Sequence, residues 1–313
     1  MRRGETPCIK AQIATESMMI DLGEGFRTWA GDRMPPRRVV RGYSKSFQDQ
    51  DLSLGRIGSL EVRLAGRKKD IKRAQRLRYE VFFEEMSAVP DFLSRLKRRD
   101  IDAFDAICDH LLVVDHALPK PKIVGTYRLL RQDVANANGG FYTANEFDIA
   151  PMLDAHRGLR FLELGRSCVA KPYRDKRTVE LLWHGIWAYV KRHKIDVMFG
   201  CASFDTTDVD ALALPLSFLH HHAGAGGEFS AKALPRRAVA MGRLDAAMIN
   251  PKLALQSLPP LIKGYLRVGA KIGEGAVIDH QFGTTDVLVN LPVSAINPRY
   301  IDYYGVDATR YAA

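Results

Sequence analysis

The stretch from Val169 to Trp183 combines the end of a strand, a basic turn and the start of an amphipathic helix. Four cations stand in or beside the turn, at Lys171, Arg174, Lys176 and Arg177. The first N–H groups of a helix have no partner within it, and the helix dipole adds partial positive charge, so such a helix start attracts phosphate. The stretch therefore indicates a site for a phosphate-bearing substrate, although many strand-to-helix turns share these features.

Two other groups of reactive side chains have simpler interpretations. Cys168 lies in the strand before the turn, where a cysteine usually packs as a small apolar residue. His220 to His222 are adjacent, so on a helix they cannot all face one metal ion. The four cysteines are far apart without CxxC spacing, which favours reduced thiols over a disulfide framework or a zinc site.

Composition limits the class of protein. The chain has 313 residues, of which 46% are hydrophobic and 26% charged, as in a soluble globular protein. No run approaches the roughly 20 apolar residues of a membrane span, and no apolar segment follows Arg2 and Arg3 as in a secretory signal. We therefore expect a cytoplasmic protein. The net charge of +10 suits a nucleic acid, an anionic lipid surface or an acidic protein as partner.

The sequence predicts a basic, disordered tail over residues 1–55 and one domain over residues 56–313. The tail lacks periodicity and is rich in Gly, Pro, Arg and Ser. After it, apolar residues at helical spacing predict a helix over residues 67–83. Residues 67–78 carry seven cations and one acid, a net charge of +6. This helix face is either a solvated surface or a docking site for an acidic partner.

The elements that must position these residues alternate along the chain. Apolar alternation predicts strands at 59–65, 110–115, 123–131, 160–170, 195–203, 275–282 and 286–291. Helical spacing predicts further helices at 178–193 and 208–222. Strands interleaved with helices indicate an α/β or α+β sheet with helices on its faces. Three strands in succession before the main helix argue against a simple doubly wound fold.

The turn around Arg174 resembles the acyl-donor loop of the GNAT acyltransferase superfamily, whose pattern is Arg/Gln-x-x-Gly-x-Gly/Ala. Arg177 and Val179 stand at the two glycine positions. Glycine permits close backbone approach to phosphate, so this loop suits a donor with one phosphodiester better than the pyrophosphate of coenzyme A. The resemblance therefore points to the phosphopantetheine arm of acyl carrier protein as donor, with no permanently bound cofactor.

A set of charged and aromatic residues has the order and spacing seen in the acyl-homoserine-lactone synthases, a branch of GNAT. The set comprises Arg78 with Phe82, Asp102 with Asp105, Arg128, and Glu163 with Arg166. Ala88 stands where that branch carries a tryptophan. From about residue 57 to 304 the chain looks most like the ornithine-acyl carrier protein N-acyltransferases. The segments that carry this likeness are 162–169, 259–267 and 279–286.

The resemblance implies a GNAT-like fold: a mixed, mostly antiparallel sheet with splayed fourth and fifth strands and helices on both faces. Here those strands are 161–170 and 195–203. The implied reaction moves a 3-hydroxyacyl group from acyl carrier protein to the α-amine of L-ornithine, giving lyso-ornithine lipid. The alternatives are another N-acyl amino acid synthase or a lactone synthase of the same superfamily, and a non-catalytic basic module that binds anionic membrane or nucleic acid. If the leading hypothesis holds, we expect the protein to contact the anionic inner membrane peripherally and not to bind nucleic acid.

The resemblance also implies roles for single residues. Glu163 is the candidate general base, against the alternative that it only pairs with an arginine. A bulge at Gly165 would bring Glu163 and Arg166 to one side of the strand. The candidate substrate-binding residues, which could instead be a structural scaffold, are Arg78, Asp102, Asp105, Arg128 and Arg166. The candidate acyl-donor residues are Val169, Tyr173, Arg174, Lys176, Arg177 and Thr178, and Lys68, Lys72 and Arg76 are further docking candidates. No metal site is expected.

Overall fold

Strands and helices alternate through residues 52–304, which are the residues that the structure, a computed structural model, describes. The strands are β1 (Ser53–Ile57), β2 (Leu60–Leu64), β3 (Asp109–Asp115), β4 (Lys122–Arg131), β5 (Phe147–Asp148), β6 (Phe161–Val169), β7 (Val197–Phe204), β8 (Lys232–Ala233), β9 (Ala238–Val239), β10 (Lys271–Asp279) and β11 (Thr284–Pro292). The α-helices are α2 (Lys68–Tyr79), α3 (Phe92–Lys97), α4 (Gln132–Ala137), α5 (Ala150–Ala155), α6 (Lys176–His193), α7 (Ala213–Ala223), α8 (Pro251–Ser257), α9 (Pro260–Val268) and α10 (Pro298–Tyr304). A π-helical segment, η2 (Glu80–Glu85), continues α2, and the short 3-10 turns include η3 (Ala103–Ala106), η4 (Tyr142–Asn145) and η5 (Lys171–Tyr173).

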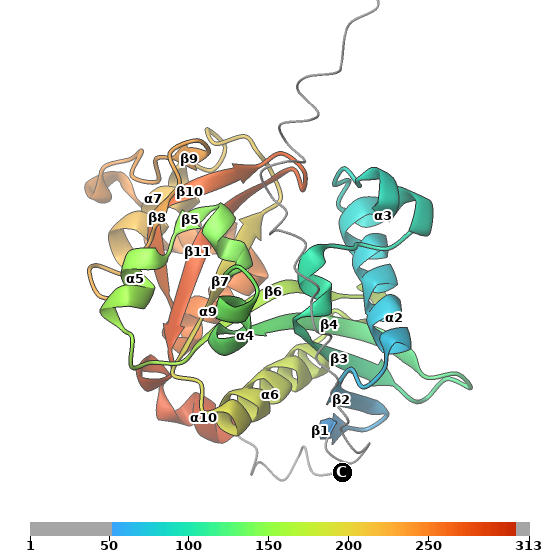
Figure 1. The fold of residues 1–313 in the computed structure, drawn as a ribbon. Helices are drawn as coiled ribbons and strands as arrows, with labels where there is room; N and C mark the ends of the chain where they lie inside the picture. Colours follow the sequence, from blue (N-terminus) through green and yellow to red (C-terminus); the bar gives the residue numbers. More distant parts are fainter. Residues whose placement is uncertain (1–51, 305–313) are drawn as a thin grey trace, which may run out of the picture. The chain divides into compact units, whose positions relative to one another are not determined.

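The strands join in one mixed sheet, in the order β1-β2-β3-β4-β6-β7-β11-β10-β8-β5, with β9 paired to β10 (Figure 1). Among these neighbours, β6 with β7 and β10 with β8 are parallel. The others are antiparallel. The predicted mixed, mostly antiparallel sheet is therefore confirmed.

Helices cover both faces of this sheet, as predicted. A Cβ on Gly125 of β4 would lie 3.6 Å from Leu182 of α6, so Gly125 faces α6. Arg128 stands three residues further along β4 and points to the opposite face. There it contacts Asp105, which accepts hydrogen bonds from Arg78 of α2. The two helices thus pack on opposite faces of the sheet at β4. In Figure 1, α6 lies below β4 and α2 to its right.

Several predicted boundaries were wrong for identifiable reasons. The helix predicted from residue 208 begins at Ala213, because the Asp208 carboxylate accepts the N–H groups of Asp210 and Ala211 and holds a turn there. Strand β10 begins at Lys271, four residues before the prediction, and its register shifts before Ala276. The glycines in that strand hide its alternation in the sequence. Residues 53–55, which the sequence assigned to the tail, belong to β1.

Strands β6 and β7 part soon after they begin, which confirms the predicted splay. Their pairing within the described residues is limited to Phe161–Val197, Leu162–Met198 and Glu163–Phe199. Beyond these pairs, β6 follows β4 and β7 follows β11. A Cβ at Gly200 would lie 2.2 Å from the Leu164 carbonyl oxygen, so a residue with a side chain cannot occupy the point of separation without moving one strand. Because parallel neighbours need a crossover connection, α6 joins the two strands.

No helix within residues 52–304 combines the length and apolarity needed to span a membrane. The predicted disordered tail lies, except for its last few residues, outside the described residues.

Candidate active site

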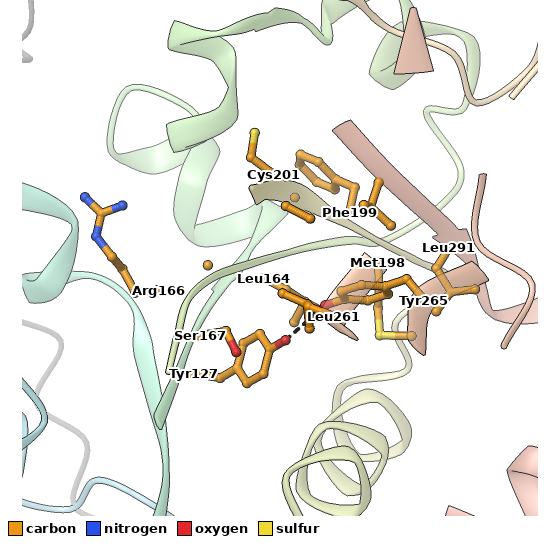
Figure 2. Close-up of a pocket in the computed structure, with 14 residues that line it drawn as sticks. Tyr127, Leu164, Arg166, Ser167, Met198, Phe199, Cys201, Leu261, Tyr265 and Leu291 are labelled. Atoms are coloured by element: carbon orange, nitrogen blue, oxygen red, sulfur yellow. Dashed lines mark hydrogen bonds between the residues drawn. The ribbon is translucent and has the colours of Figure 1, made fainter. Parts of the chain in front are cut away.

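A pocket opens between the parted strands β6 and β7 (Figure 2). It measures about 370 Å³, including its mouth, and is lined by Tyr127, residues 164–167, residues 198–202, Leu261, Tyr265, Val289 and Leu291. The hydroxyls of Tyr127 and Tyr265 lie 3.3 Å apart on one side, and Figure 2 shows Arg166 extending away from them. Strand edges that part in this way present backbone N–H and C=O groups to the pocket. An extended chain that carries amides can hydrogen-bond such edges like an added strand.

The predicted bulge in β6 is present, with a different residue at its centre. Thr126 pairs with Cys168 while Arg128 pairs with Gly165, so β6 has one extra residue between them. Arg166, not Gly165, adopts the left-handed conformation, with φ of 49°. The bulge brings Glu163 and Arg166 to one side of β6, as expected, because both meet Tyr142 there. The Tyr142 N–H donates to Glu163, and the Tyr142 ring stacks on the Arg166 guanidinium.

Glu163 is buried, and backbone donors hold both of its carboxylate oxygens. Oε1 accepts the N–H of Thr143 at 2.6 Å, and Oε2 accepts the N–H of Tyr142 at 3.0 Å. Burial raises the pKa of Glu163, while these hydrogen bonds work in the opposite direction. The carboxylate therefore fixes the start of η4 to β6, next to the pocket-lining Leu164.

The five predicted substrate-binding residues lie together, as a buried charge network on the α2 face of the sheet. Arg78, fully buried, donates to Asp100 Oδ2 at 2.7 Å and to Asp105 Oδ1 at 2.8 Å. Arg128 Nη1 lies 2.6 Å from both oxygens of Asp102. Burial opposes ionisation of both Asp105 and Asp102, but the arginines prevail and lower the pKa of each. These aspartates are therefore ionised and neutralised within the protein.

Arg166 joins this network from β6 and is its link to the pocket. Its Nε lies 3.2 Å from Asp100 Oδ2, and its Nη2 lies 3.3 Å from Asp102 Oδ2. Its guanidinium stacks 4.9 Å from the Tyr142 ring and 4.8 Å from the Phe282 ring. Asp100 was missed at the sequence level. The available signal was that it is an acid directly after a run rich in cations from Arg95 to Arg99.

A second charged cluster lies beside Cys201 of the pocket lining, and sequence reasoning missed it. Glu146, Asp279 and Asp286 are each at most 6% exposed, and one oxygen of each lies within 4.8 Å of the others. Burial and the charge of Asp286 raise the pKa of Glu146 to about 7. Burial and the charge of Asp279 raise that of Asp286 to about 6. A signal was present in the sequence, because Asp279 and Asp286 are the first and last residues of one segment that carried the family resemblance.

With this geometry defined, comparisons with known proteins assign the chain. Residues 77–184 match the acetyltransferase (GNAT) domain family. The chain is 57% identical over 261 residues to a Brucella abortus protein named L-ornithine N(alpha)-acyltransferase, covering 82% of this chain and 93% of that protein. An Agrobacterium fabrum protein of the same name is 54% identical over 275 residues, covering 87% and 94%. The chain belongs to the L-ornithine N(alpha)-acyltransferase family.

The predicted GNAT-like fold and the acyltransferase class are thus confirmed. Among solved structures, FeeM, an N-acyl amino acid synthase from uncultured soil microbes, aligns with a TM-score of 0.41 and 10% identity. That alignment covers 75% of this chain and 91% of FeeM.

The residues predicted to contact the acyl donor in this family member lie at the end of β6 and the start of α6. Val169 O accepts from Arg174 Nε, and Arg174 also pairs with Glu85 at 2.6 Å. The Tyr173 hydroxyl donates to Asp115 at 2.8 Å. Lys176 and Arg177 are exposed, whereas Thr178 is buried.

The expectation that the N–H groups at this helix start are free was wrong for one of them. The Asp175 carboxylate caps the helix by accepting the Thr178 N–H at 2.9 Å. Cys168 is buried in the hydrophobic core, and burial raises its pKa to about 12, so its thiol stays neutral. This agrees with its interpretation as a packing residue.

The acidic cluster generates a prediction about stability and pH. Because folding raises the pKa of Glu146 to about 7, the folded state favours the protonated form. The contribution to stability is complete below the unfolded-state pKa and is lost as the pH rises through the folded-state value. Glu146→Gln, which mimics the protonated acid, should therefore gain stability over the wild type between about pH 5 and about pH 8, by up to about 3 kcal/mol.

Chemical unfolding at both pH values measures this difference. Glu274→Gln is the matched control, since Glu274 is exposed and pairs with Lys232 on the surface. Parallel stability profiles of wild type and Glu146→Gln would show that the cluster does not titrate in this range.

Proposed function

We propose that the protein transfers a 3-hydroxyacyl group from the phosphopantetheine arm of acyl carrier protein to the α-amine of L-ornithine, giving lyso-ornithine lipid. The names of the relatives support ornithine as acceptor. The observation that carries the proposal is the pocket between β6 and β7, which has strand edges for an acyl-donor arm and is lined by Arg166 and by Leu164, the residue after Glu163.

The chemistry asks for orientation and proton transfer rather than covalent catalysis. A thioester is already activated, so the acceptor amine can attack its carbonyl carbon directly. The C–N bond forms, the C–S bond breaks, and the leaving thiol takes up a proton. The enzyme must align the two substrates, remove protons from the α-ammonium and stabilise the transient oxyanion.

For the acceptor, we propose that Arg166 binds the α-carboxylate. It is the arginine of the network that lines the pocket, and its side chain is 14% exposed, against 0% for Arg78 and 4% for Arg128. An arginine guanidinium matches a carboxylate in charge and geometry. In this proposal, Asp100 and Asp102 hold Arg166 in place, and Arg78, Arg128 and Asp105 hold these two aspartates through the rest of the network.

For the proton, we propose Glu163 as the general base, acting through a water molecule. It is a buried carboxylate that precedes the pocket-lining Leu164 in β6, and burial raises its pKa, which makes it a stronger base. Its hydrogen bonds to η4 fix its position. The proposal requires that the attacking amine lie on the same side of β6 as Glu163.

For the donor, we propose that acyl carrier protein docks on the cations of α2 and of the α6 start. Lys68, Lys72, Arg76, Arg174, Lys176 and Arg177 are exposed. Contact with an anionic membrane stays a prediction. Exposed apolar residues beside cations on α3, such as Phe92 and Leu96 at 81% and 69%, are where flotation with anionic vesicles would test it.

The proposed reaction predicts one product above others. Purified protein with 3-hydroxyacyl carrier protein should convert ornithine to its Nα-acyl derivative, which mass spectrometry detects. Lysine, glutamine and S-adenosylmethionine serve as competing acceptors. A lactone from S-adenosylmethionine, or preferred acylation of glutamine, would replace ornithine as the acceptor in this proposal.

Docking through exposed charge predicts a donor-specific defect. Arg76→Glu should raise KM for the acylated carrier protein several-fold and weaken its dependence on salt, while KM for ornithine is unchanged. Lys252→Glu on α8 is the matched charge reversal away from the proposed surface. Equal KM values in the two variants would remove α2 from the docking site.

The base role predicts a loss in kcat rather than in binding. Glu163→Gln should lower kcat by roughly 100-fold or more, with little change in KM for ornithine. It should also remove the acidic limb of the pH–rate profile. Glu274→Gln, a surface substitution of the same kind, should leave both unchanged. A variant that keeps the wild-type pH profile and loses activity only in proportion to stability would mark Glu163 as a structural residue.

A further inference from the structure

We infer that Glu146, Asp279 and Asp286 form the site for the side-chain ammonium of the acceptor, and that this site determines which of its two nitrogens is acylated. The inference rests on the proposed function, because it assigns one end of the substrate of that same site.

The cluster carries negative charge that the protein itself does not balance. Within residues 52–304, no lysine or arginine forms an ion pair with any of the three carboxylates. Glu146 Oε2 and Asp286 Oδ1 are buried without a hydrogen-bond partner. The Thr284 hydroxyl, 4% exposed, lies beside Asp286, where it lowers the pKa of that acid, and it too has no partner within hydrogen-bond distance. Buried carboxylates are costly unless paired, so a cationic ligand is the missing partner.

The cluster lies next to the acyl-transfer pocket through Cys201. This residue lines the pocket, and its side chain contacts Glu146 and lowers the pKa of that carboxyl. Its Sγ lies 3.9 Å from the Thr143 hydroxyl, and the Thr143 N–H is bound to Glu163. Two residues, Thr143 and Cys201, therefore connect the proposed base to Glu146 of the cluster. Arg166 is near enough to lower the pKa of both Glu146 and Asp286.

This order of charges matches an α-amino acid with a cationic side chain. Arg166 would hold the α-carboxylate, Glu163 would face the α-amine, and the cluster would hold the terminal ammonium at the end of a short methylene chain. Neighbouring carboxylates raise the pKa of an ammonium and keep it protonated. A protonated nitrogen has no lone pair and cannot attack a thioester, so the α-nitrogen is acylated.

A metal ion fits the cluster less well than an ammonium. Asp279 Oδ1 already accepts the N–H groups of Gln281 and Phe282, at 2.8 and 3.2 Å, and so holds the turn between β10 and β11. The other oxygen of Asp279 is still available, so the cluster offers three carboxylate ligands. Calcium usually takes about six to eight oxygen ligands, and magnesium about six in strict geometry.

The test compares ornithine with norvaline, which has the same carbon chain but no terminal amine. The wild type should favour ornithine in kcat/KM by roughly 30-fold or more, as for loss of one partner of a buried charge pair. Asp286→Asn should lose most of this preference, because its kcat/KM for ornithine falls. Fragmentation of the acyl-ornithine product of this variant in the mass spectrometer should reveal acylation at the terminal nitrogen. Asp154→Asn, an exposed aspartate on α5, is the matched control.

Binding without donor separates this inference from the proposed reaction. Thermal shift of the wild type should be larger with ornithine than with norvaline, and the difference should vanish in Asp286→Asn. Removal of an unpaired buried carboxylate should not prevent folding, which the melting temperature of the free variant checks. If no acceptor is acylated but this binding difference appears, the reaction is wrong and the ammonium site stands. Unchanged selectivity in Asp286→Asn, or Mn²⁺ binding that ornithine does not displace, would overturn the ammonium site.

Discussion

When two neighbouring parallel strands stop pairing, the backbone N–H and C=O groups on their facing edges lose each other as hydrogen-bond partners. Strands β6 and β7 separate in this way beyond Glu163 and Phe199. The protein stabilises this separation rather than closing it. Strand β6 stays paired with β4 on both sides of its extra residue, and eight consecutive pairs join β7 to β11. Gly200 lets the two strands approach closely at the last point of contact. The opening is therefore part of the sheet, and in the proposed reaction the acyl-donor arm replaces the missing strand pairing.

The charged residues around this opening form two sets. In one set the cations and acids are equal in number, and the other consists of acids. On the α2 side, Arg78, Arg128 and Arg166 face Asp100, Asp102 and Asp105, so the cations and acids balance. On the β10–β11 side, three carboxylates lie together, and burial and the neighbouring acids raise the pKa values of Glu146 and Asp286. The arginine–aspartate network fixes the side chains of the site, whereas we propose that the acidic cluster is neutralised by a cationic ligand.

The sequence predicted the sheet and most of the site but could not predict how the site residues share partners. Alternation and helical spacing located β3, β4, β6, β7 and α6, because each buries a regular apolar face. The same patterns could not locate β10, where glycines interrupt the alternation, or the start of α7, where a side chain caps a turn. Short helices such as α4 and α5 have too few residues for a period to emerge. The network residues were predictable only through the resemblance to the acyl-homoserine-lactone synthases, whereas Asp100 and Glu146 depend on chain crossings that only the folded structure defines.

The η4 turn links the two sets of charges and so makes the site one unit. Its first N–H groups bind Glu163, its Tyr142 ring stacks on Arg166, and the chain reaches Glu146 as the turn ends. A displacement of this turn would move the proposed base, loosen the arginine that we assign to the α-carboxylate and shift one acid of the ammonium site together. Discrimination among acceptors and proton removal are then not independent properties. An acceptor that fails to engage the cluster leaves buried charge uncompensated beside the same turn that positions Glu163, so poor recognition is expected to lower the rate of transfer as well as the affinity.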